Sequence, residues 1–288
     1  MKLTHLFSSG NVGSLHVENR IVRSATFMRK AEKRGQVGGS HVDYYSDLAK
    51  GGMGLIITGF LVVDPGGSAS PYQAALYDDR FIPGHADLTK KVHDYDTKIA
   101  AQLGHTGRQG AHPKFPPIAP SAIKDKVTGL TPKEMSTEEV HQIIEKFADA
   151  GERAFESGYD AVQLHAAHGY LLSNFLSPYT NKRTDQFGGS VKNRARILVN
   201  IHDVLSERVG KSFPILVKLQ TQDFVPNGLT LEEGKEITRI AVEAGFDAIE
   251  PSGGLDETQL GRKETYPSKV VKEKEDENYF LPTAKELK

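Results

Sequence analysis

Two histidines and a tyrosine stand close together in the segment from His165 to Tyr170, which reads HAAHGY. Two imidazoles can donate hydrogen bonds to a carbonyl oxygen, and a neighbouring phenol can supply a proton. A pair of buried, satisfied histidines fits the spacing of His165 and His168 equally well. Chelation of a metal is the third interpretation, but catalytic zinc needs a third protein ligand and none is obvious nearby. Metal is therefore the least favoured of the three, and we expect no metal site.

Other polar residues also fall where buried strands are expected to end. Gln102 carries an amide donor and acceptor that suit the edge of a heteroaromatic ring, or that cap a strand end. Lys218 lies inside the apolar run PILVKL, where an unpaired ammonium would be costly. It needs an anion, a ligand or a carboxylate, and Glu250 is a candidate for a structural ion pair. Arg183 and Arg194–Arg196 are read as solvated or packing groups.

Short apolar runs predict six strands, and an internal repeat relates some of them. The phrases AFESGYDAVQL and AVEAGFDAIEP, which begin at Ala154 and Ala241, align position by position. Helix, glycine and strand in repeated order favour a parallel sheet with helical crossovers. The predicted strands are Arg20–Ala25, Leu55–Phe60, Ile99–Leu103, Ala161–His165, Ile215–Leu219 and Ala248–Pro251.

A helix is predicted after each strand, near residues 41–50, 84–95, 137–157, 191–208, 230–244 and 279–287. Ser136 with Glu139 and Thr230 with Glu233 have the spacing of capping boxes at two of the helix starts. Six such units fit a barrel or a doubly wound sheet. No Gly-x-Gly-x-x-Gly follows the first strand, which argues against a dinucleotide-binding fold. The charged stretch Arg262–Glu277 predicts a loop.

The composition excludes several classes of function. The net charge of -1 gives no reason to expect nucleic acid or an anionic membrane as partner. No run approaches the roughly 20 apolar residues of a membrane span, and the start lacks a signal-peptide core, so a cytoplasmic location is the default. With no cysteine in the chain, disulfides, thiolate nucleophiles and iron–sulfur clusters are excluded.

Four motifs together resemble the Old Yellow Enzyme, or NADH:flavin oxidoreductase, family. They are NRIVRSA at Asn19–Ala25, GLIITGF at Gly54–Phe60, QLGHTGR at Gln102–Arg108, and HAAHGYLLSNFLSPYTNKRTDQFGGS at His165–Ser190. They occur in the family's order, and the last is highly specific. The two histidines, in place of a histidine and an asparagine, are similar to the branch that includes bacterial dienoyl-CoA reductase-like members.

The resemblance implies an FMN-containing TIM (β/α)8 barrel that reduces the C=C bond of α,β-unsaturated carbonyl compounds. NADH or NADPH would reduce the flavin, and a small-molecule enone or enoyl compound would be the substrate. By resemblance, His165 and His168 hold the carbonyl oxygen and Tyr170 protonates the α-carbon. Gln102 and Lys218 correspond to residues beside the pyrimidine edge of the flavin. The flavin-facing segments after the first two strands correspond to Ser24, Ala25, Thr26 and Gly59, or its neighbour Phe60.

Two departures from the family pattern stand out. The aromatic Phe27, on the substrate side, lies near a position where the family carries Thr, Cys or Glu groups that tune the flavin. The chain also ends at Lys288, after the sixth unit. We therefore expect one domain over residues 1–288, an incomplete barrel that lacks its last one or two βα units and the loops that hold the FMN phosphate. The alternative is a truncated or split barrel that does not hold FMN by itself, as a remnant or an interaction module. A second copy or a partner chain is a candidate to complete the barrel.

Overall fold

Six parallel strands form the centre of the fold and follow one another around a curved sheet in chain order. The computed structural model describes residues 3–110, 112–255 and 272–288. The sheet runs β3, β4, β6, β9, β10, β11, and the short β5 (Leu61–Val62) pairs with β6. All these pairings are parallel. The strands are β3 (Val22–Arg23), β4 (Leu55–Ile57), β6 (Lys98–Gly104), β9 (Ala161–Ala166), β10 (Ile215–Gln220) and β11 (Ala248–Ser252).

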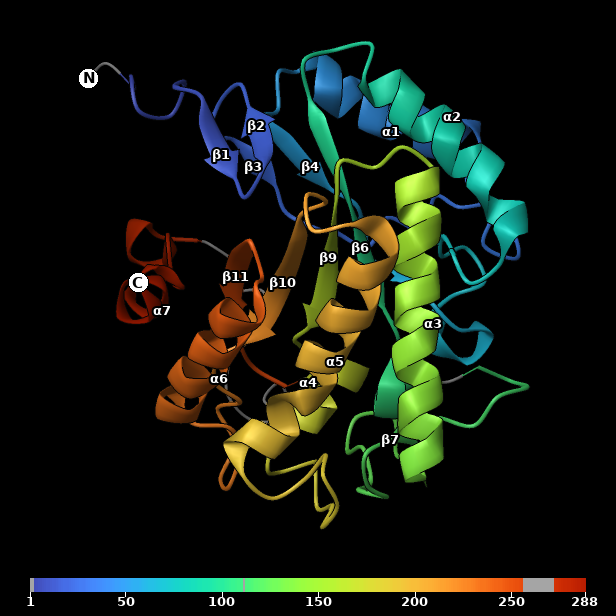
Figure 1. Cartoon of the computed structure of the whole chain (residues 1–288), viewed down its shortest axis with the longest axis vertical. Helices are drawn as coiled ribbons and strands as arrows, with labels where there is room; N and C mark the ends of the chain where they lie inside the picture. The colour runs from blue at the N-terminus through green and yellow to red at the C-terminus, as the bar shows by residue number, and fades with distance from the viewer. Residues whose placement is uncertain (1–2, 111, 256–271) are drawn as a thin grey trace.

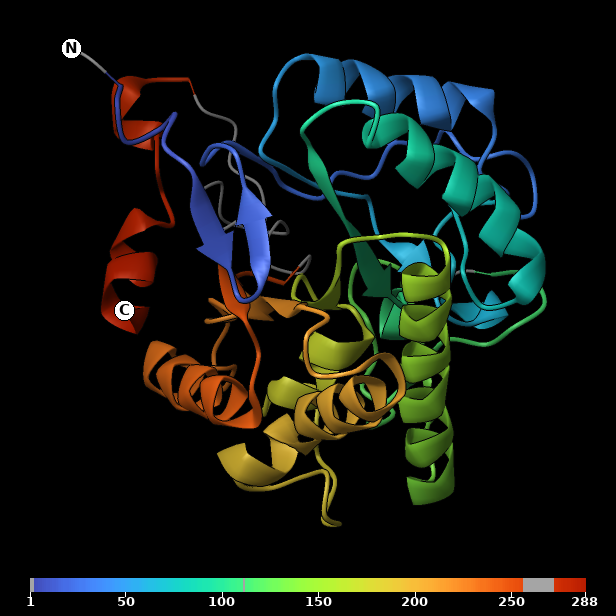
Figure 2. The same ribbon diagram turned by 45° about the horizontal axis from the view of Figure 1, so that its top comes forward.

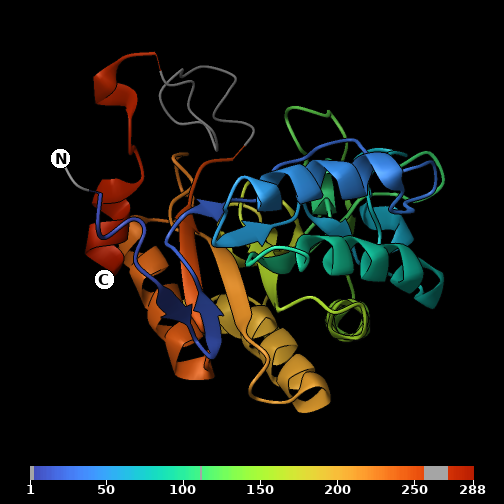
Figure 3. The same ribbon diagram turned by 90° about the horizontal axis from the view of Figure 1, so that it is seen from above.

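Helices cover the outer side of this sheet (Figure 1). Seen from above, five of them follow the strands in an arc (Figure 3). They are α1 (Gly39–Lys50), α2 (Ile82–Val92), α3 (Thr137–Glu156), α5 (Val191–Val209) and α6 (Leu231–Ala244). A doubly wound sheet reverses its strand order at a switch point, whereas this order never reverses. The fold is therefore a partial TIM barrel, and the barrel interpretation of the sequence is confirmed.

The helix starts follow the capping signals of the sequence. Ser136 and Glu139 form a complete capping box at the start of α3, and Thr230 and Glu233 form a second one at the start of α6. Each box satisfies two backbone N–H groups that the first helical turn leaves without partners. The last helix, α7 (Leu281–Leu287), has no buried residue and contacts the fold through α6, where Lys235 pairs with Glu286. It follows β11 as expected but does not cover the sheet.

The two faces of the sheet have different cores, because alternate residues of a strand point to opposite sides. The outer face packs against the helices in the larger cluster, which includes Ile56, Val162 and Val217. The inner face forms a smaller apolar cluster with the hairpin β1 (Gly10–Val12) and β2 (Leu15–Val17). Its buried members are Leu15, Val17, Leu55, Ile57, Ala100, Ala161 and Leu216.

The hairpin, seen beside the sheet in Figure 2, closes one end of the concave side. The Ser14 hydroxyl donates to the carbonyl of Ser212, just before β10. An added Cβ at Gly13, which has a φ of +55°, would meet the Asp247 carboxylate at 2.0 Å. The strands start at this end. The smaller apolar cluster, called the apolar plug below, therefore fills the half of the concave face nearest the strand starts. Polar residues occupy the same face farther along the strands.

The internal repeat has a structural meaning. Asp160 and Asp247 occupy the same place in the two repeated phrases, one residue before β9 and β11. The Asp160 carboxylate accepts a hydrogen bond from the backbone N–H of Ile99 at 2.8 Å, and Asp247 accepts one from Ile215 at 2.9 Å. Each aspartate thus ties the start of its own strand to the start of the preceding one. The repeat encodes strand pairing as well as secondary structure.

Several short elements were not predicted. They are the hairpin β1–β2, the pair β7 (Ile118–Ala119) and β8 (Lys133–Glu134), and the helix α4 (Leu171–Leu176), whose residues are all buried. The predicted loop at Arg262–Glu277 lies mostly outside the described residues, and its end forms a 3-10 turn at Lys274–Asp276. None of the helices in the described ranges has the length and apolar character that crossing a membrane requires.

We expect the two repeated aspartates to differ in their contribution to stability. Asp160→Ala should lower the free energy of unfolding by about 2–3 kcal/mol, because Asp160 is largely buried and also lies 2.8 Å from His93 Nε2. Asp247→Ala should cost about 1 kcal/mol, because Asp247 is exposed and water can replace its hydrogen bond. Urea unfolding of the two variants measures this difference. Equal losses would contradict it.

Candidate active site

A partly buried ion pair lies on the concave face of the sheet. Lys218 Nζ is 2.9 Å from Glu250 Oε1 and 3.1 Å from Ser24 Oγ, and the Ser24 hydroxyl donates to Glu250 Oε1 at 2.6 Å. Burial alone would raise the pKa of the Glu250 carboxyl, but the Lys218 charge and hydrogen bonds from Ser24 and Gln163 hold it below its ordinary value. The ion pair considered from the sequence is present. Since Ser24 follows β3 and Glu250 lies in β11, this contact joins the two edge strands of the sheet.

Two glutamine side chains continue the polar row across the sheet. Gln102 Nε2 donates to Gln163 Oε1 at 2.7 Å, and Gln163 Nε2 donates to Glu250 Oε2 at 3.0 Å. The backbone N–H of Gln102 donates to Thr58 Oγ1 at 3.1 Å. Within the described part of the chain, Gln102 Oε1 accepts no hydrogen bond. The row from Gln102 to Lys218 therefore ends in an open acceptor on one side and a cation on the other.

An aromatic cluster lies beside this row, at the end of β9. The His165 ring packs edge-on against the rings of His168, Tyr170 and Phe60, at centroid distances of 5.1, 5.0 and 5.7 Å. The phenol ring of Tyr170 also packs on Phe60 at 5.2 Å. His165 Nδ1 is buried and has no hydrogen-bond partner in the described residues. Such an unsatisfied buried nitrogen is costly unless a ligand completes it. The three residues predicted to act together do meet in space.

The backbone of His168 is held in the left-handed region, with a φ of +65°. This conformation is unfavourable for a residue with a Cβ, so the surroundings must stabilise it. The N–H of His168 donates to Gln220 Oε1 at 2.8 Å, and Gln220 Nε2 donates to Asp223 Oδ1 at 2.9 Å. On the ring, His168 Nε2 lies 2.6 Å from Ser252 Oγ. Residues of β10 and β11 thus orient an imidazole that follows β9.

Both histidines are held in the neutral state by their surroundings. Burial, then the nearby His168 and Lys218 charges, lowers the pKa of His165 well below its usual range. Burial and the Lys218 charge lower the pKa of His168 to about 3, although Glu250 opposes this shift. A neutral imidazole keeps one N–H donor, which can hydrogen-bond an oxygen without releasing its proton. The site therefore combines neutral donors with one partly buried cation.

The segments that follow β3 and β4 approach each other closely. An added Cβ at Gly59 would lie 2.4 Å from the Thr26 carbonyl oxygen, so only glycine fits there. The Gly59 N–H donates to Tyr45 Oη at 2.9 Å, which fixes the segment against α1. Ala25 packs on the inner apolar cluster. Phe27 is 42% exposed and has the Arg29 guanidinium 5.6 Å from its ring centre, so it lies at the rim and outside the buried row.

Comparison with known proteins agrees with this geometry. The profile of the NADH:flavin oxidoreductase / NADH oxidase family matches residues 5–252. The chain belongs to this family. An NADH oxidase of Thermoanaerobacter brockii is 40% identical over 263 residues, which cover 89% of this chain and 40% of that protein. The chain thus spans about two fifths of the length of that curated relative.

Solved structures of other proteins share the fold. A 2-naphthoyl-CoA reductase in complex with 2-naphthoyl-CoA superposes with a TM-score of 0.90 and 26% identity, over 98% of this chain and 44% of that one. Old Yellow Enzyme from Pichia sp. AKU4542 superposes with a TM-score of 0.76 and 26% identity, over 85% of this chain and 70% of that one. These likenesses agree with the resemblance carried by the sequence motifs.

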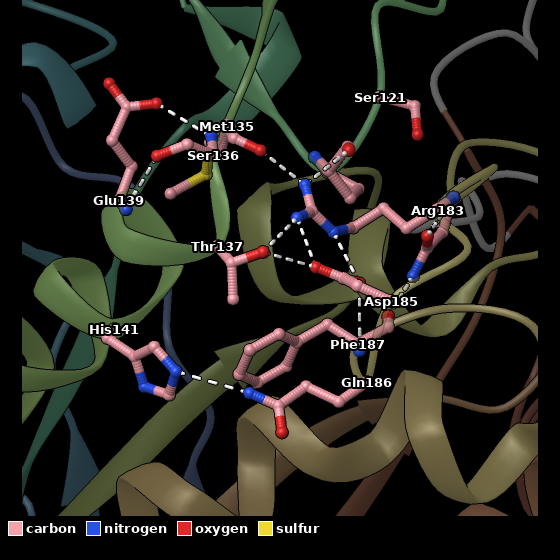
Figure 4. Close-up of polar contacts among 12 residues, drawn as sticks. Ser121, Met135, Ser136, Thr137, Glu139, His141, Arg183, Asp185, Gln186 and Phe187 are labelled. Atoms are coloured by element: carbon pink, nitrogen blue, oxygen red, sulfur yellow. Dashed lines mark hydrogen bonds and ion pairs between the residues drawn. The ribbon is translucent and has the colours of Figure 1, made fainter.

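The second half of the long family motif is structural. Arg183 donates to the carbonyls of Pro120 and Met135 and pairs with Asp185, which also accepts from Thr137 (Figure 4). Asp185 has a pKa of about 2, lowered mainly by the Arg183 guanidinium. The motif therefore fastens the loop before α5 to the start of α3. Arg183 is one of the packing groups expected from the sequence.

The sequence did not single out three residues that contribute to the site. Gln163 links Gln102 to Glu250, Gln220 holds the His168 backbone, and Ser252 contacts the His168 ring. Each lies two residues along a strand from a residue that the sequence did single out. Because alternate residues of a strand point to the same face, this spacing could have identified all three. Among residues 3–110, 112–255 and 272–288, no group of three His, Asp or Glu side chains is placed to hold a metal ion.

We expect His168→Asn to make the unfolding free energy less sensitive to acid. The pKa of His168 is about 3 in the folded protein and about 6.5 in an unfolded chain. The unfolded state therefore binds a proton first, and stability falls as the pH drops below about 6.5. Asparagine tolerates a positive φ and does not titrate. Between pH 7 and pH 5, urea unfolding of the variant should show a loss about 2 kcal/mol smaller than wild type. Parallel losses would show that His168 is not held neutral.

Proposed function

We propose that this chain is the FMN-binding barrel of an oxidoreductase that reduces the C=C bond of α,β-unsaturated carbonyl compounds with NADH or NADPH. The observation that carries the proposal is the polar row Gln102–Gln163–Glu250–Lys218 beside the cluster of His165, His168 and Tyr170. One group can hold the edge of a flat heteroaromatic ring, and the other can receive a carbonyl oxygen. FMN, when bound, would supply the hydride that the protein's own side chains cannot.

The polar row fits the pyrimidine edge of a flavin, which alternates N–H donors with carbonyl acceptors. Gln102 Oε1 offers a free acceptor, and its buried position leaves little freedom to turn away. The Lys218 ammonium would stabilise negative charge at the ring edge. Ser24, Ala25, Thr26 and Gly59 would present backbone groups to the same ring. Glu250 would keep Lys218 in place and partly offset its charge.

The aromatic cluster fits the reacting end of an enone. His165 and His168, both neutral, would donate hydrogen bonds to the carbonyl oxygen and stabilise the negative charge that develops there. His165 has a nitrogen that lacks a partner in the described residues, as a donor or acceptor reserved for a ligand would. The Tyr170 phenol would transfer its proton to the α-carbon. Phe27, at the rim, would contact the rest of the substrate.

An absorbance spectrum tests the proposal directly. The purified chain is mixed with FMN and passed through a gel-filtration column. A flavin band that elutes with the protein supports the proposal, and an enone can then be offered together with NADH or NADPH. A colourless protein that releases all added FMN would overturn the proposal for this chain. It would favour the alternative, a barrel that does not hold the cofactor by itself.

The open edges of the sheet are sites where further strands could pair. Strands β3 and β11 are the two edges of the described sheet, and Val22 in β3 is 49% exposed. Unpaired strand edges are templates for further pairing. We therefore propose that additional strands, from a partner chain or a second copy, pair with these edges when the barrel is complete.

We expect Tyr170→Phe to slow enone reduction by about 100-fold or more, because general acid catalysis contributes on that order. Reduction of the bound flavin by the nicotinamide should remain nearly unchanged, since that step needs no proton from the phenol. Stopped-flow absorbance measures the two half-reactions separately. An equal loss in both would refute the role of Tyr170 as proton donor.

We expect Glu250→Gln to raise the reduction potential of bound FMN by on the order of 30 mV, which is about 1.4 kcal/mol for two electrons. Without the carboxylate, the Lys218 charge is offset less and stabilises the reduced, anionic ring more strongly. Equilibrium photoreduction against a reference dye measures the potential. Glu236→Gln, at an exposed position on α6, is the matched control and should leave the potential unchanged. A potential that does not move in Glu250→Gln would contradict this role.

A further inference from the structure

A cavity lies next to the aromatic cluster, among the loops that follow β3, β5 and β6. Its volume is about 560 Å³, within the range of roughly 300–1,000 Å³ that small-molecule sites occupy. Its walls come from the turn after β5, the segment around Ser68–Gln73, and the segment His112–Phe115. None of the residues proposed for catalysis lines it. The cavity therefore needs an explanation of its own.

The charge of this cavity has one sign. Its lining contains Arg34, Arg80, Lys114 and His112 but no aspartate or glutamate. Arg34 and Lys114 form no ion pair with any residue of the described chain. Arg80 forms one long ion pair, with Asp78 at 3.9 Å; its guanidinium also donates to Tyr77 Oη at 3.3 Å and lies 4.9 Å from the centre of the Phe81 ring. Cations that line one concavity without a carboxylate beside them attract anions, and arginine in particular matches the geometry of phosphate oxygens.

Two aromatic rings also line the cavity, Phe115 and Tyr77. Phe115 packs beside the His112 ring at a centroid distance of 4.9 Å, and it lies over the turn at Gly66, where an added Cβ would come within 3.2 Å of its own Cβ. Tyr77 contributes a further ring, with the Arg80 guanidinium 5.8 Å from its centre. Exposed aromatic faces and a guanidinium plane are surfaces on which a heteroaromatic ring can stack.

We propose that this cavity binds a ligand of the nucleoside diphosphate class. The phosphates would contact Arg34, Arg80 and Lys114, and the base would lie against Phe115 and Tyr77. The volume, the single sign of charge and the aromatic walls support the same ligand chemistry. This site does not depend on FMN, so it stands or falls separately from the function proposed above.

Two kinds of ligand contain a nucleoside diphosphate. One is a free nucleotide, and the other is a longer ligand whose nucleotide half occupies the cavity while its other end reaches the aromatic cluster. The two regions are adjacent, because Gln73 lines the cavity and its Nε2 donates to the carbonyl of Phe60. Phe60 in turn contacts His165 and Tyr170. A dinucleotide such as NADH is the test case for the longer ligand.

Isothermal titration of the chain with ADP tests the site without any flavin. We expect ADP to bind more tightly than inorganic pyrophosphate or adenosine alone, and to weaken as the salt concentration rises. Displacement of bound ADP by NADH would identify the site as the nucleotide half of a longer ligand. ADP that NADH does not displace would identify a separate nucleotide site. ADP that does not bind, or that binds no more tightly than pyrophosphate, would overturn the assignment to a nucleotide.

Substitutions at exposed positions locate the binding. Arg34→Gln and Lys114→Gln should each weaken ADP about tenfold, the equivalent of about 1.4 kcal/mol. Phe115→Ala should weaken ADP while leaving pyrophosphate nearly unchanged. All three side chains are exposed, so folding should be unaffected. Lys192→Gln, an exposed cation on α5, is the matched control and should bind ADP like wild type. Equal affinity in the Arg34, Lys114 and control variants would place the binding elsewhere and overturn the proposal.

Discussion

The charge of Lys218 on the inner face of the sheet is the constraint on which the site depends. An ammonium buried there without a partner would be strongly unfavourable. It is satisfied by Glu250 and Ser24, while Gln163 fills the other oxygen of Glu250. Together with Lys218, these three partners come from four separate parts of the chain. The Lys218 side chain can therefore be placed on the inner face only when β3, β9, β10 and β11 are all in position, because its polar partners come from these strands.

Strand register then decides what the cation acts on. Lys218 is the direct partner of His165 across β9 and β10, and of Glu250 across β10 and β11. The lysine charge thus lies between a carboxylate whose pKa it helps to lower and an imidazole whose low pKa is due first to burial, with Lys218 adding to the effect. A slip of one residue would turn all of these side chains to the helix-covered face. The apolar plug beneath them, built on Leu15 and Val17, makes such a slip costly because it would expose the plug.

The sequence predicted the repeating units well because their signals are local. Capping boxes, the glycines Gly158 and Gly245 of the two repeated phrases and the apolar stripe of α3 depend on a few neighbouring residues, and all were found in place. The site was predicted in part. Its histidines and tyrosine are adjacent in the chain, whereas the contact from Ser24 to Glu250 spans 226 positions and leaves no local trace. The positive φ of His168 was equally hidden, because the hydrogen bond that holds this backbone comes from Gln220, at the end of another strand.

Phe60 is the element that the two concave regions share. Its ring forms a wall of the aromatic cluster, and it fits against the end of β6 only because Gly104 has no side chain, since an added Cβ there would lie 2.7 Å from the ring. Its carbonyl is held by Gln73, whose own Oε1 accepts from the N–H of Ala69 in the cavity wall. A ligand that orders the cavity wall would thus also hold the Phe60 backbone. Gln73 is thus one link between the two regions and the chain itself is another, because Val62 lines the cavity two residues after Phe60.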